Sequence, residues 1–68
     1  MEKFGKRLRT VRMEKKKTQK QTAEMLDMKL RSYQLYEQGT VEPSIAKLIA
    51  LADFFDVSLD YLMGRTDS

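Results

Sequence analysis

The side chains that could bind or transform a ligand in this chain are cationic, carboxylic and amide groups, because the sequence contains no Cys and no His. It therefore has no thiol nucleophile, no disulfide, no imidazole base and no thiolate or imidazole metal ligand. Residues 1–40 hold 11 Lys and Arg against 5 Asp and Glu, whereas residues 41–68 hold 2 against 5. This asymmetry favours attraction to a polyanion, either nucleic acid or an anionic membrane surface, over catalysis.

The basic residues are concentrated early in the chain, where a run of three Lys follows three Arg: Arg7, Arg9, Arg12, Lys15, Lys16 and Lys17. Such a run also serves simply to solvate the end of a helix, so charge alone leaves both interpretations open. The acidic residues Asp53, Asp56 and Asp60 could imitate a Mg²⁺ site. Helix capping explains them better, because Asp56 and Asp60 flank a predicted helix start, where negative charge is favourable. We expect no metal and no cofactor.

The length of the chain limits the number of domains that it can form. Sixty-eight residues form at most one domain, which we expect to span residues 1–68. No apolar run approaches the roughly 20 residues that a membrane span needs, and the start, MEKFGKRLRT, does not resemble a signal peptide. Together with the absence of Cys, this predicts a soluble, cytoplasmic protein without a membrane partner.

The elements that must position the polar residues are all predicted to be helical. Phe4, Leu8 and Val11 recur at helical spacing, so an amphipathic helix is expected from residue 2 to about 15, where the Lys run ends it. Thr18 and Gln21 form a capping-box pattern for a short second helix that reaches Leu26. The next residue, Asp27, tolerates a left-handed backbone, and Met28 turns inward at the bend.

The third helix is predicted from Lys29 or Leu30 to Glu37, with Tyr33 and Tyr36 on one face and Gly39 as its stop. Pro43 and Ser44 introduce a fourth helix. Its wide apolar stripe is expected to lie at the centre of the core: Ile45, Leu48, Ile49, Leu51, Ala52 and Phe55. Ser58 caps a short fifth helix, which carries Leu59, Leu62 and Met63 and ends at Gly64. The sequence thus predicts a compact all-α domain of five helices.

The stretch from Gln19 to Glu37, followed by Gly39 and Pro43, carries the most information. It resembles the helix-turn-helix of the Cro and phage-repressor family, also called the XRE or lambda-repressor-like family. The family pattern is Gln-x-x-Leu-Ala-x-x-Leu-Gly-Val-Ser, then a recognition helix ending near Tyr-Glu-x-Gly, then Pro-Ser. The likeness extends from Phe4 and Gly5 to the final Val-Ser-Leu-Asp-Tyr-Leu, and it puts the helix-turn-helix at about residues 18–38.

Physical reasons support the pattern. Ala23 stands where two helices would cross closely, and a larger side chain would force them apart. Three residues depart from the family: Thr22 replaces a leucine, Asp27 replaces the turn glycine, and Lys29 replaces the serine that caps the recognition helix. Thr22 is expected to weaken the local core slightly. Lys29 puts a mobile cation near the DNA and leaves the start of the third helix undecided between two residues.

The resemblance implies that five residues of the third helix face the bases in the major groove: Lys29, Leu30, Arg31, Gln34 and Leu35. Arg31 is the best candidate, because a guanidinium binds both O6 and N7 of guanine, while Gln34 would read adenine or reach a phosphate. Leu30 and Leu35 offer no hydrogen bond. They would contact thymine methyl groups, or instead pack in the core or a dimer interface.

Phosphate contacts are expected from the rim of the same site: Arg12, Thr18, Gln19, Ser32, Gln38 and Thr40. The start of the second helix adds free N–H groups and the positive end of a helix dipole. Lys15, Lys16 and Lys17 would add affinity without specificity. The family often pairs the positions of Arg12 and Glu37 in a partly buried ion pair, which we expect here.

The resemblance implies a non-enzymatic, sequence-specific double-stranded DNA-binding transcriptional regulator. We expect a repressor that binds a palindromic operator as a homodimer, at least on DNA, with Leu62 and Met63 as candidate dimer contacts and no small-molecule ligand. One alternative is an antitoxin-like protein-interaction module with secondary DNA binding. Another is a membrane-surface binder, although membrane binding does not require the helix-turn-helix motif that the basic residues surround.

Overall fold

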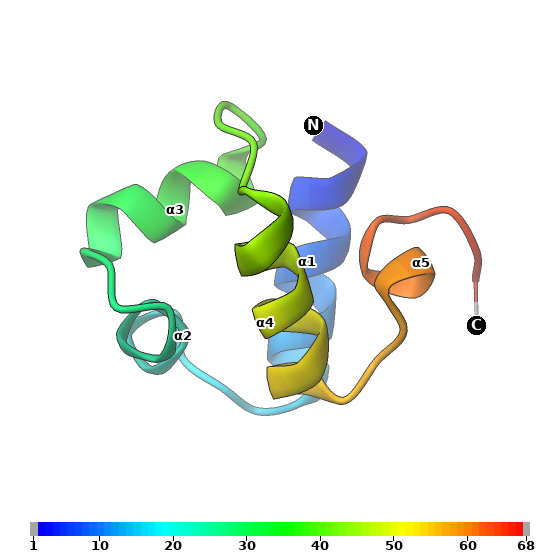
Figure 1. The fold of residues 1–68 in the computed structure, drawn as a ribbon, viewed down its shortest axis with the longest axis horizontal. Helices are drawn as coiled ribbons and strands as arrows, with labels where there is room; N and C mark the ends of the chain where they lie inside the picture. The colour runs from blue at the N-terminus through cyan, green and yellow to red at the C-terminus, as the bar shows by residue number, and fades with distance from the viewer. Residues whose placement is uncertain (1, 68) are drawn as a thin grey trace.

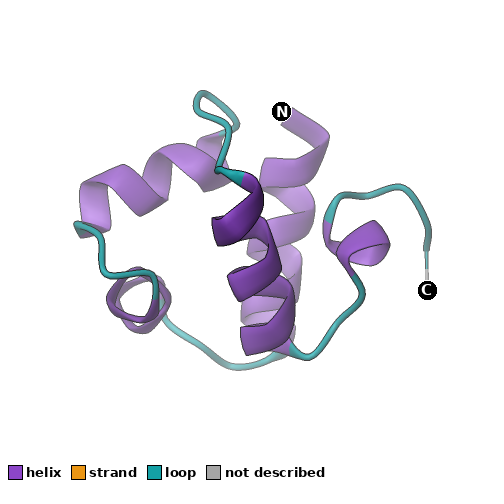
Figure 2. Cartoon of the chain, viewed as in Figure 1, coloured by secondary structure: helices purple, strands orange, loops and turns teal. Residues whose placement is uncertain are grey.

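The computed structural model describes residues 2–67, and these form five α-helices without a β-strand (Figures 1 and 2). In chain order the helices are α1 (Glu2–Glu14), α2 (Gln19–Met25), α3 (Leu30–Gln38), α4 (Ile45–Phe55) and α5 (Leu59–Leu62). The predicted all-α class and the order of the five helices are confirmed. None of the described helices is long and apolar enough to cross a lipid bilayer.

Side-chain caps start three of the helices where the sequence predicts them. The Thr18 hydroxyl accepts a hydrogen bond from the Gln21 backbone N–H at 2.9 Å, and the Gln21 side-chain oxygen accepts one from the Thr18 N–H at 2.8 Å. This reciprocal pair is the predicted capping box at the start of α2. The hydroxyls of Ser44 and Ser58 cap α4 and α5 in the same way by accepting from backbone N–H groups three residues later.

Left-handed residues end the helices and turn the chain. Gly39 ends α3 with φ of 80°, and Asp27 follows α2 with φ of 54°, as predicted. Asp56 has the same φ after α4, and Lys16 has φ of 58° in the turn between α1 and α2. A non-glycine residue is strained in this region. Backbone hydrogen bonds close the turn at Lys16, because its N–H donates to the Met13 carbonyl at 3.0 Å and the next N–H donates to the Arg12 carbonyl at 3.1 Å.

All five helices contribute apolar side chains to the core, although α5 contributes only Leu62. The buried side chains are Phe4, Leu8, Val11, Ala23, Leu26, Tyr33, Tyr36, Leu48, Leu51, Ala52, Phe55 and Leu62. Ala23 is buried where α2 meets α3, and Figure 1 shows α2 nearly end-on while α3 lies across the view. The two helices pack together at a steep angle, and the side of α3 that carries Arg31 and Gln38 is left exposed.

The predicted stripe of α4 is too wide. Ile45 is 73% exposed and Ile49 is 47% exposed, whereas Leu48 and Leu51 are buried. Ile45 and Ile49 are four residues apart, so they lie on one line of the helix, and the next residue on that line is the exposed Asp53. This line of α4 therefore remains in solvent.

Candidate nucleic-acid interface

The uncovered face of α3 carries a ridge of side chains at positions i, i+3, i+4 and i+7. These are Arg31, Gln34, Leu35 and Gln38. Arg31 and Gln38 are exposed, and Gln34 and Leu35 are half-buried. The opposite face holds the buried rings of Tyr33 and Tyr36, which meet edge to face with centroids 6.2 Å apart. Burial of both tyrosines fixes the rotation of α3 about its axis and thereby turns the ridge outward.

α3 begins at Leu30, and Lys29 is its N-cap residue with an extended backbone. Lys29 is exposed, and Leu30 is 41% exposed. In the described structure the Lys29 side chain makes no capping hydrogen bond to the helix. Ser32, half-buried, lies on the flank of α3 away from Gln34. Neither Leu30 nor Leu35 belongs to the buried core.

The end of α3 is closed by Gly39 and Thr40. The backbone N–H of Thr40 donates to the Leu35 carbonyl at 3.1 Å, and its hydroxyl donates to the same oxygen at 3.3 Å. The left-handed Gly39 allows the chain to fold back for this contact. Gln38 and Thr40 are both exposed, so they lie at the edge of the ridge.

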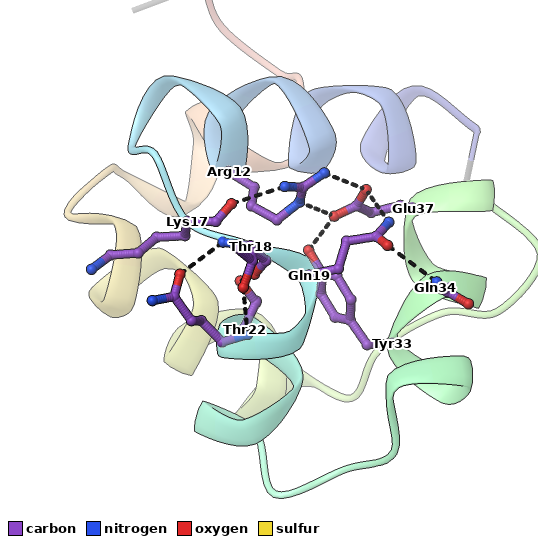
Figure 3. A network of polar contacts seen from close by, with 9 residues as sticks. Arg12, Lys17, Thr18, Gln19, Thr22, Tyr33, Gln34 and Glu37 are labelled. Carbon is purple, nitrogen blue, oxygen red and sulfur yellow. Dashed lines mark hydrogen bonds and ion pairs between the residues drawn. The ribbon is translucent and has the colours of Figure 1, made fainter.

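Behind the ridge, the Glu37 carboxylate is held by four donors from three helices (Figure 3). Its Oε2 accepts from Arg12 Nε at 2.7 Å and from the Tyr33 hydroxyl. Its Oε1 accepts from Gln19 Nε2 at 3.1 Å and from Arg12 Nη2 at 3.4 Å. A carboxylate offers about four acceptor positions, so this group is fully used. The predicted ion pair between Arg12 and Glu37 is confirmed.

The electrostatics of this cluster follow from its burial, since the Glu37 side chain is only 4% exposed. Burial opposes ionisation of Glu37, but hydrogen bonds from Arg12, Tyr33 and Gln19 outweigh it and lower the pKa of the carboxyl below its ordinary value. Burial and the neighbouring Glu37 carboxylate raise the pKa of the Tyr33 hydroxyl. The hydrogen bond to Glu37 raises the pKa of Arg12. The cluster therefore holds one negative and one positive charge across the neutral pH range.

Arg12 also ties α1 to the start of α2. Its Nη1 donates to the Lys17 carbonyl oxygen at 2.8 Å, immediately before the N-cap residue Thr18. Three of its five N–H groups are thus used, and its side chain is 12% exposed. Arg12 is consequently a brace between helices, and two of its N–H groups remain outside these contacts.

Gln19 is less accessible than the exposed Thr18 beside it. Its Nε2 donates to Glu37, and its Oε1 accepts from Gln34 Nε2 at 3.1 Å (Figure 3). This second contact was not expected from the sequence. Gln19 and Gln34 lie 15 residues apart, and only the crossing of α2 and α3 brings them together.

Thr22 is fully buried, and its hydroxyl donates to the Thr18 carbonyl at 2.9 Å. The polar group that replaces the family leucine is therefore satisfied within α2. No buried side-chain N or O atom in the described part of the chain lacks a hydrogen-bond partner. The site is a satisfied, preorganised scaffold behind an exposed ridge.

Arg7 is a second organising residue that sequence reasoning missed. Its Nη1 donates to the carbonyls of Tyr61 at 2.7 Å and Thr66 at 3.0 Å, and its guanidinium lies 4.4 Å from the centroid of the Tyr61 ring. It therefore fastens the end of the chain to α1 and does not extend the basic surface. Arg7 lies on α1 between the buried Phe4 and Leu8, and this position could have indicated that its side chain packs against the rest of the domain.

The acidic residues Asp53, Asp56 and Asp60 do not form a metal-binding cluster. Within residues 2–67, no three Asp or Glu side chains are close enough together to hold a metal ion. Asp56 occupies the left-handed C-cap of α4, and Asp60 lies in the first turn of α5, 3.9 Å from Arg65.

Comparison with known proteins agrees with this geometry. A model of the helix-turn-helix family matches residues 8–62. The chain is 42% identical over 64 residues to the HTH-type transcriptional regulator YobD of Bacillus subtilis, covering 94% of this chain and 57% of that protein.

Two further relatives are also named as transcriptional regulators. The chain is 38% identical over 63 residues to the cryptic phage CTXphi transcriptional repressor RstR of Vibrio cholerae, which covers 93% of this chain and 56% of RstR. It is 35% identical over 64 residues to the regulator ImmR of Bacillus subtilis, covering 94% and 50% respectively. The chain thus spans about half the length of these relatives. No solved structure matched it. The chain belongs to the Cro and phage-repressor type of helix-turn-helix proteins.

Proposed function

We propose that this chain is a DNA-binding transcriptional regulator that inserts the ridge of α3 into the major groove of a specific operator. The observation that carries the proposal is the rotation of α3: burial of Tyr33 and Tyr36 turns Arg31 and Gln34 to the uncovered side. A protruding helix is what a groove about 12 Å wide admits. The net positive charge of residues 1–40 supplies the sequence-independent attraction to phosphate.

Within this proposal, Arg31 reads guanine through a bidentate contact, because it is exposed on the ridge. Lys29, Leu30, Gln34 and Leu35 complete the surface that meets the bases. Leu30 and Leu35 would contact thymine methyl groups, since neither belongs to the buried core, although only Leu30 is exposed and Leu35 is half-buried.

Phosphate contacts would flank this surface. Six residues are assigned to them: Arg12, Thr18, Gln19, Ser32, Gln38 and Thr40. Thr18, Gln38 and Thr40 are exposed, which supports the assignment. Arg12 would contribute through the two N–H groups that remain after its contacts with Glu37 and Lys17. Gln19 would contribute its backbone N–H at the start of α2.

We further propose repression of transcription from a palindromic operator bound by a homodimer, because one short helix reads too few base pairs for useful specificity. The name of one relative, a phage transcriptional repressor, supports the direction of regulation. The prediction that Leu62 contacts a second chain is wrong, because this side chain is fully buried in the core of its own chain. Met63 packs against that core and is half-buried.

Selection of bound fragments from random duplex DNA, followed by sequencing, tests the proposal. Enrichment of a palindrome is the expected result, and sedimentation should give two chains per enriched duplex. An absence of any enriched sequence would overturn operator binding and favour the protein-interaction module instead.

Two variants then distinguish base recognition from sequence-independent attraction to the phosphates. Arg31→Ala should lose about 1 to 3 kcal/mol of binding free energy on the enriched duplex and much less on a scrambled one. Lys16→Ala, the matched control, should weaken binding to both duplexes equally and reduce the salt dependence of binding. Equal losses on both duplexes for Arg31→Ala would reduce Arg31 to a phosphate contact.

A further inference from the structure

A chain of hydrogen bonds runs from the buried Glu37 to the DNA-facing ridge, and its direction is set by chemistry. An ionised carboxylate only accepts hydrogen bonds. The group that Gln19 turns toward Glu37 Oε1, 3.1 Å away, must therefore be its NH₂. The oxygen of the same amide then points the other way.

The next link follows from the first. Because the oxygen of Gln19 faces Gln34, the atom that Gln34 turns toward it must be a donor, and Gln34 Nε2 lies 3.1 Å from Gln19 Oε1. Figure 3 shows this order, with the nitrogen of Gln34 turned toward Gln19. Reversing the Gln34 amide would bring two oxygens together. The orientation of Gln34 is thus set by a carboxylate that it does not touch.

We propose that Gln19, held by Glu37, is a positioning residue for base recognition, and that it orients the Gln34 amide to read adenine. After its bond to Gln19, Gln34 keeps its oxygen and one N–H for a ligand. Adenine in the major groove offers a matching pair, the N6 amino donor and the N7 acceptor. Guanine offers two acceptors there, so the Gln34 oxygen would meet the O6 oxygen of guanine.

The inference rests on the proposed function, since it requires that α3 enters the major groove. It also gives Gln19 a role in specificity in addition to the backbone contact proposed above. Holding a side chain in its bound orientation before binding saves the ordering cost of that side chain, which corresponds to about a two- to tenfold gain in affinity. Loss of Gln19 should therefore reduce the preference for adenine by that factor.

The test is the same selection from random duplex DNA, carried out with the full chain and three variants. Gln34→Met identifies the operator position that depends on Gln34, where the unmodified chain should prefer adenine. Gln19→Met should reduce that preference about two- to tenfold while preferences at other positions persist, although Gln34 is still present. Gln38→Met is the matched control, because it removes an exposed amide of the same ridge outside the hydrogen-bond chain. Because Gln38 is a proposed phosphate contact, its loss should lower the affinity for all duplexes about equally and leave the preference for adenine at the Gln34-dependent position intact.

Thermal unfolding followed by circular dichroism establishes that each variant is folded. If Gln19→Met does not fold, Gln19→Asn replaces it, since the shorter amide cannot bridge Glu37 and Gln34. An unchanged adenine preference in a folded Gln19 variant would overturn the inference, as would a preference for another base at the Gln34-dependent position. Failure of the unmodified chain to enrich any sequence would instead overturn the proposed function.

Discussion

Two ion pairs in this small domain each join an Arg to a carboxylate, but they lie in different surroundings. Arg12 and Glu37 join α1 to α3 at 2.7 Å, with side chains 12% and 4% exposed. Arg65 and Asp60 lie 3.9 Å apart near the end of the chain, with side chains 77% and 68% exposed. In the first pair the carboxylate accepts four hydrogen bonds; the second is a single contact in solvent.

The comparison teaches that burial and shared partners, rather than charge, decide what a pair does. In solvent, water screens the charges and replaces either partner at little cost. In the α1–α3 junction, removing one partner leaves the other buried without compensation. The buried pair also lies behind the proposed DNA-reading ridge, where Glu37 accepts a hydrogen bond from Gln19 and Gln19 accepts one from Gln34.

Breaking the buried pair should give the largest effect. Arg12→Met or Glu37→Met should each lower the free energy of unfolding by about 3 kcal/mol, because each leaves an uncompensated buried charge. The double variant should lose much less than the sum of the two, since neither charge then remains. Urea unfolding of the three variants measures this, and additive losses would show that the two side chains act independently.

The backbone contact beside the pair gives the next largest effect. A Cβ atom on Gly5 would lie 2.6 Å from the Glu37 carbonyl oxygen and 2.9 Å from that of Tyr36. Gly5→Ala should therefore force α1 away from α3 and destabilise the domain by about 1 to 3 kcal/mol, despite the higher helix propensity of Ala. Thr10→Ala, at an exposed position of α1, is the control and should change stability by less than about 0.5 kcal/mol. Equal stability of the two variants would contradict the close approach.

Acid should weaken the junction by removing only the negative charge. The pKa of Glu37 is lowered in the folded protein from its ordinary value of 4.5, because the hydrogen bonds to the carboxylate outweigh its burial. The unfolded chain therefore takes up this proton first as the pH falls, which favours unfolding. The stability that Glu37 contributes should be complete above pH 4.5 and disappear as the pH falls toward its folded pKa.

Chemical unfolding across this pH range tests that expectation, with Glu37→Gln as the reference. The neutral variant lacks this titration, so its stability should depend less on pH than that of the unmodified chain. Parallel pH profiles for the two proteins would assign the acid sensitivity to other carboxyl groups.

The exposed pair should give the smallest effect. Arg65→Ala should change the free energy of unfolding by at most about 0.5 kcal/mol, because the pair is long and solvated. Added salt should reduce that small difference further, because salt screens exposed charges. A loss comparable to that of Arg12→Met would mean that exposure does not separate the two pairs.

Much of the fold was predictable because it is local. The capping box at Thr18 and Gln21, the left-handed Asp27 and the inward tyrosines of α3 each depend on residues within a few positions of one another. Hydrophobic spacing and capping act over this range, so they can be seen in the sequence. The ion pair between Arg12 and Glu37 was predicted only through the family resemblance, since 25 residues separate them.

Non-local features were predicted poorly. The apolar spacing of α4 did not distinguish the buried Leu48 from the exposed Ile45, because exposure depends on which sides of a helix its neighbours cover. Leu62 was assigned to a dimer contact for the same reason, although it fills the core of its own chain.

The sequence by itself determined the order of the five helices, the caps that start three of them, and that the first 40 residues carry the positive charge. Only the tertiary structure decided that Glu37 holds Gln19 and that Gln19 in turn holds Gln34. The physical reason is range: a helix cap joins neighbours along the chain, whereas a hydrogen bond between amides on α2 and α3 exists only at the distance and angle that the packed core imposes.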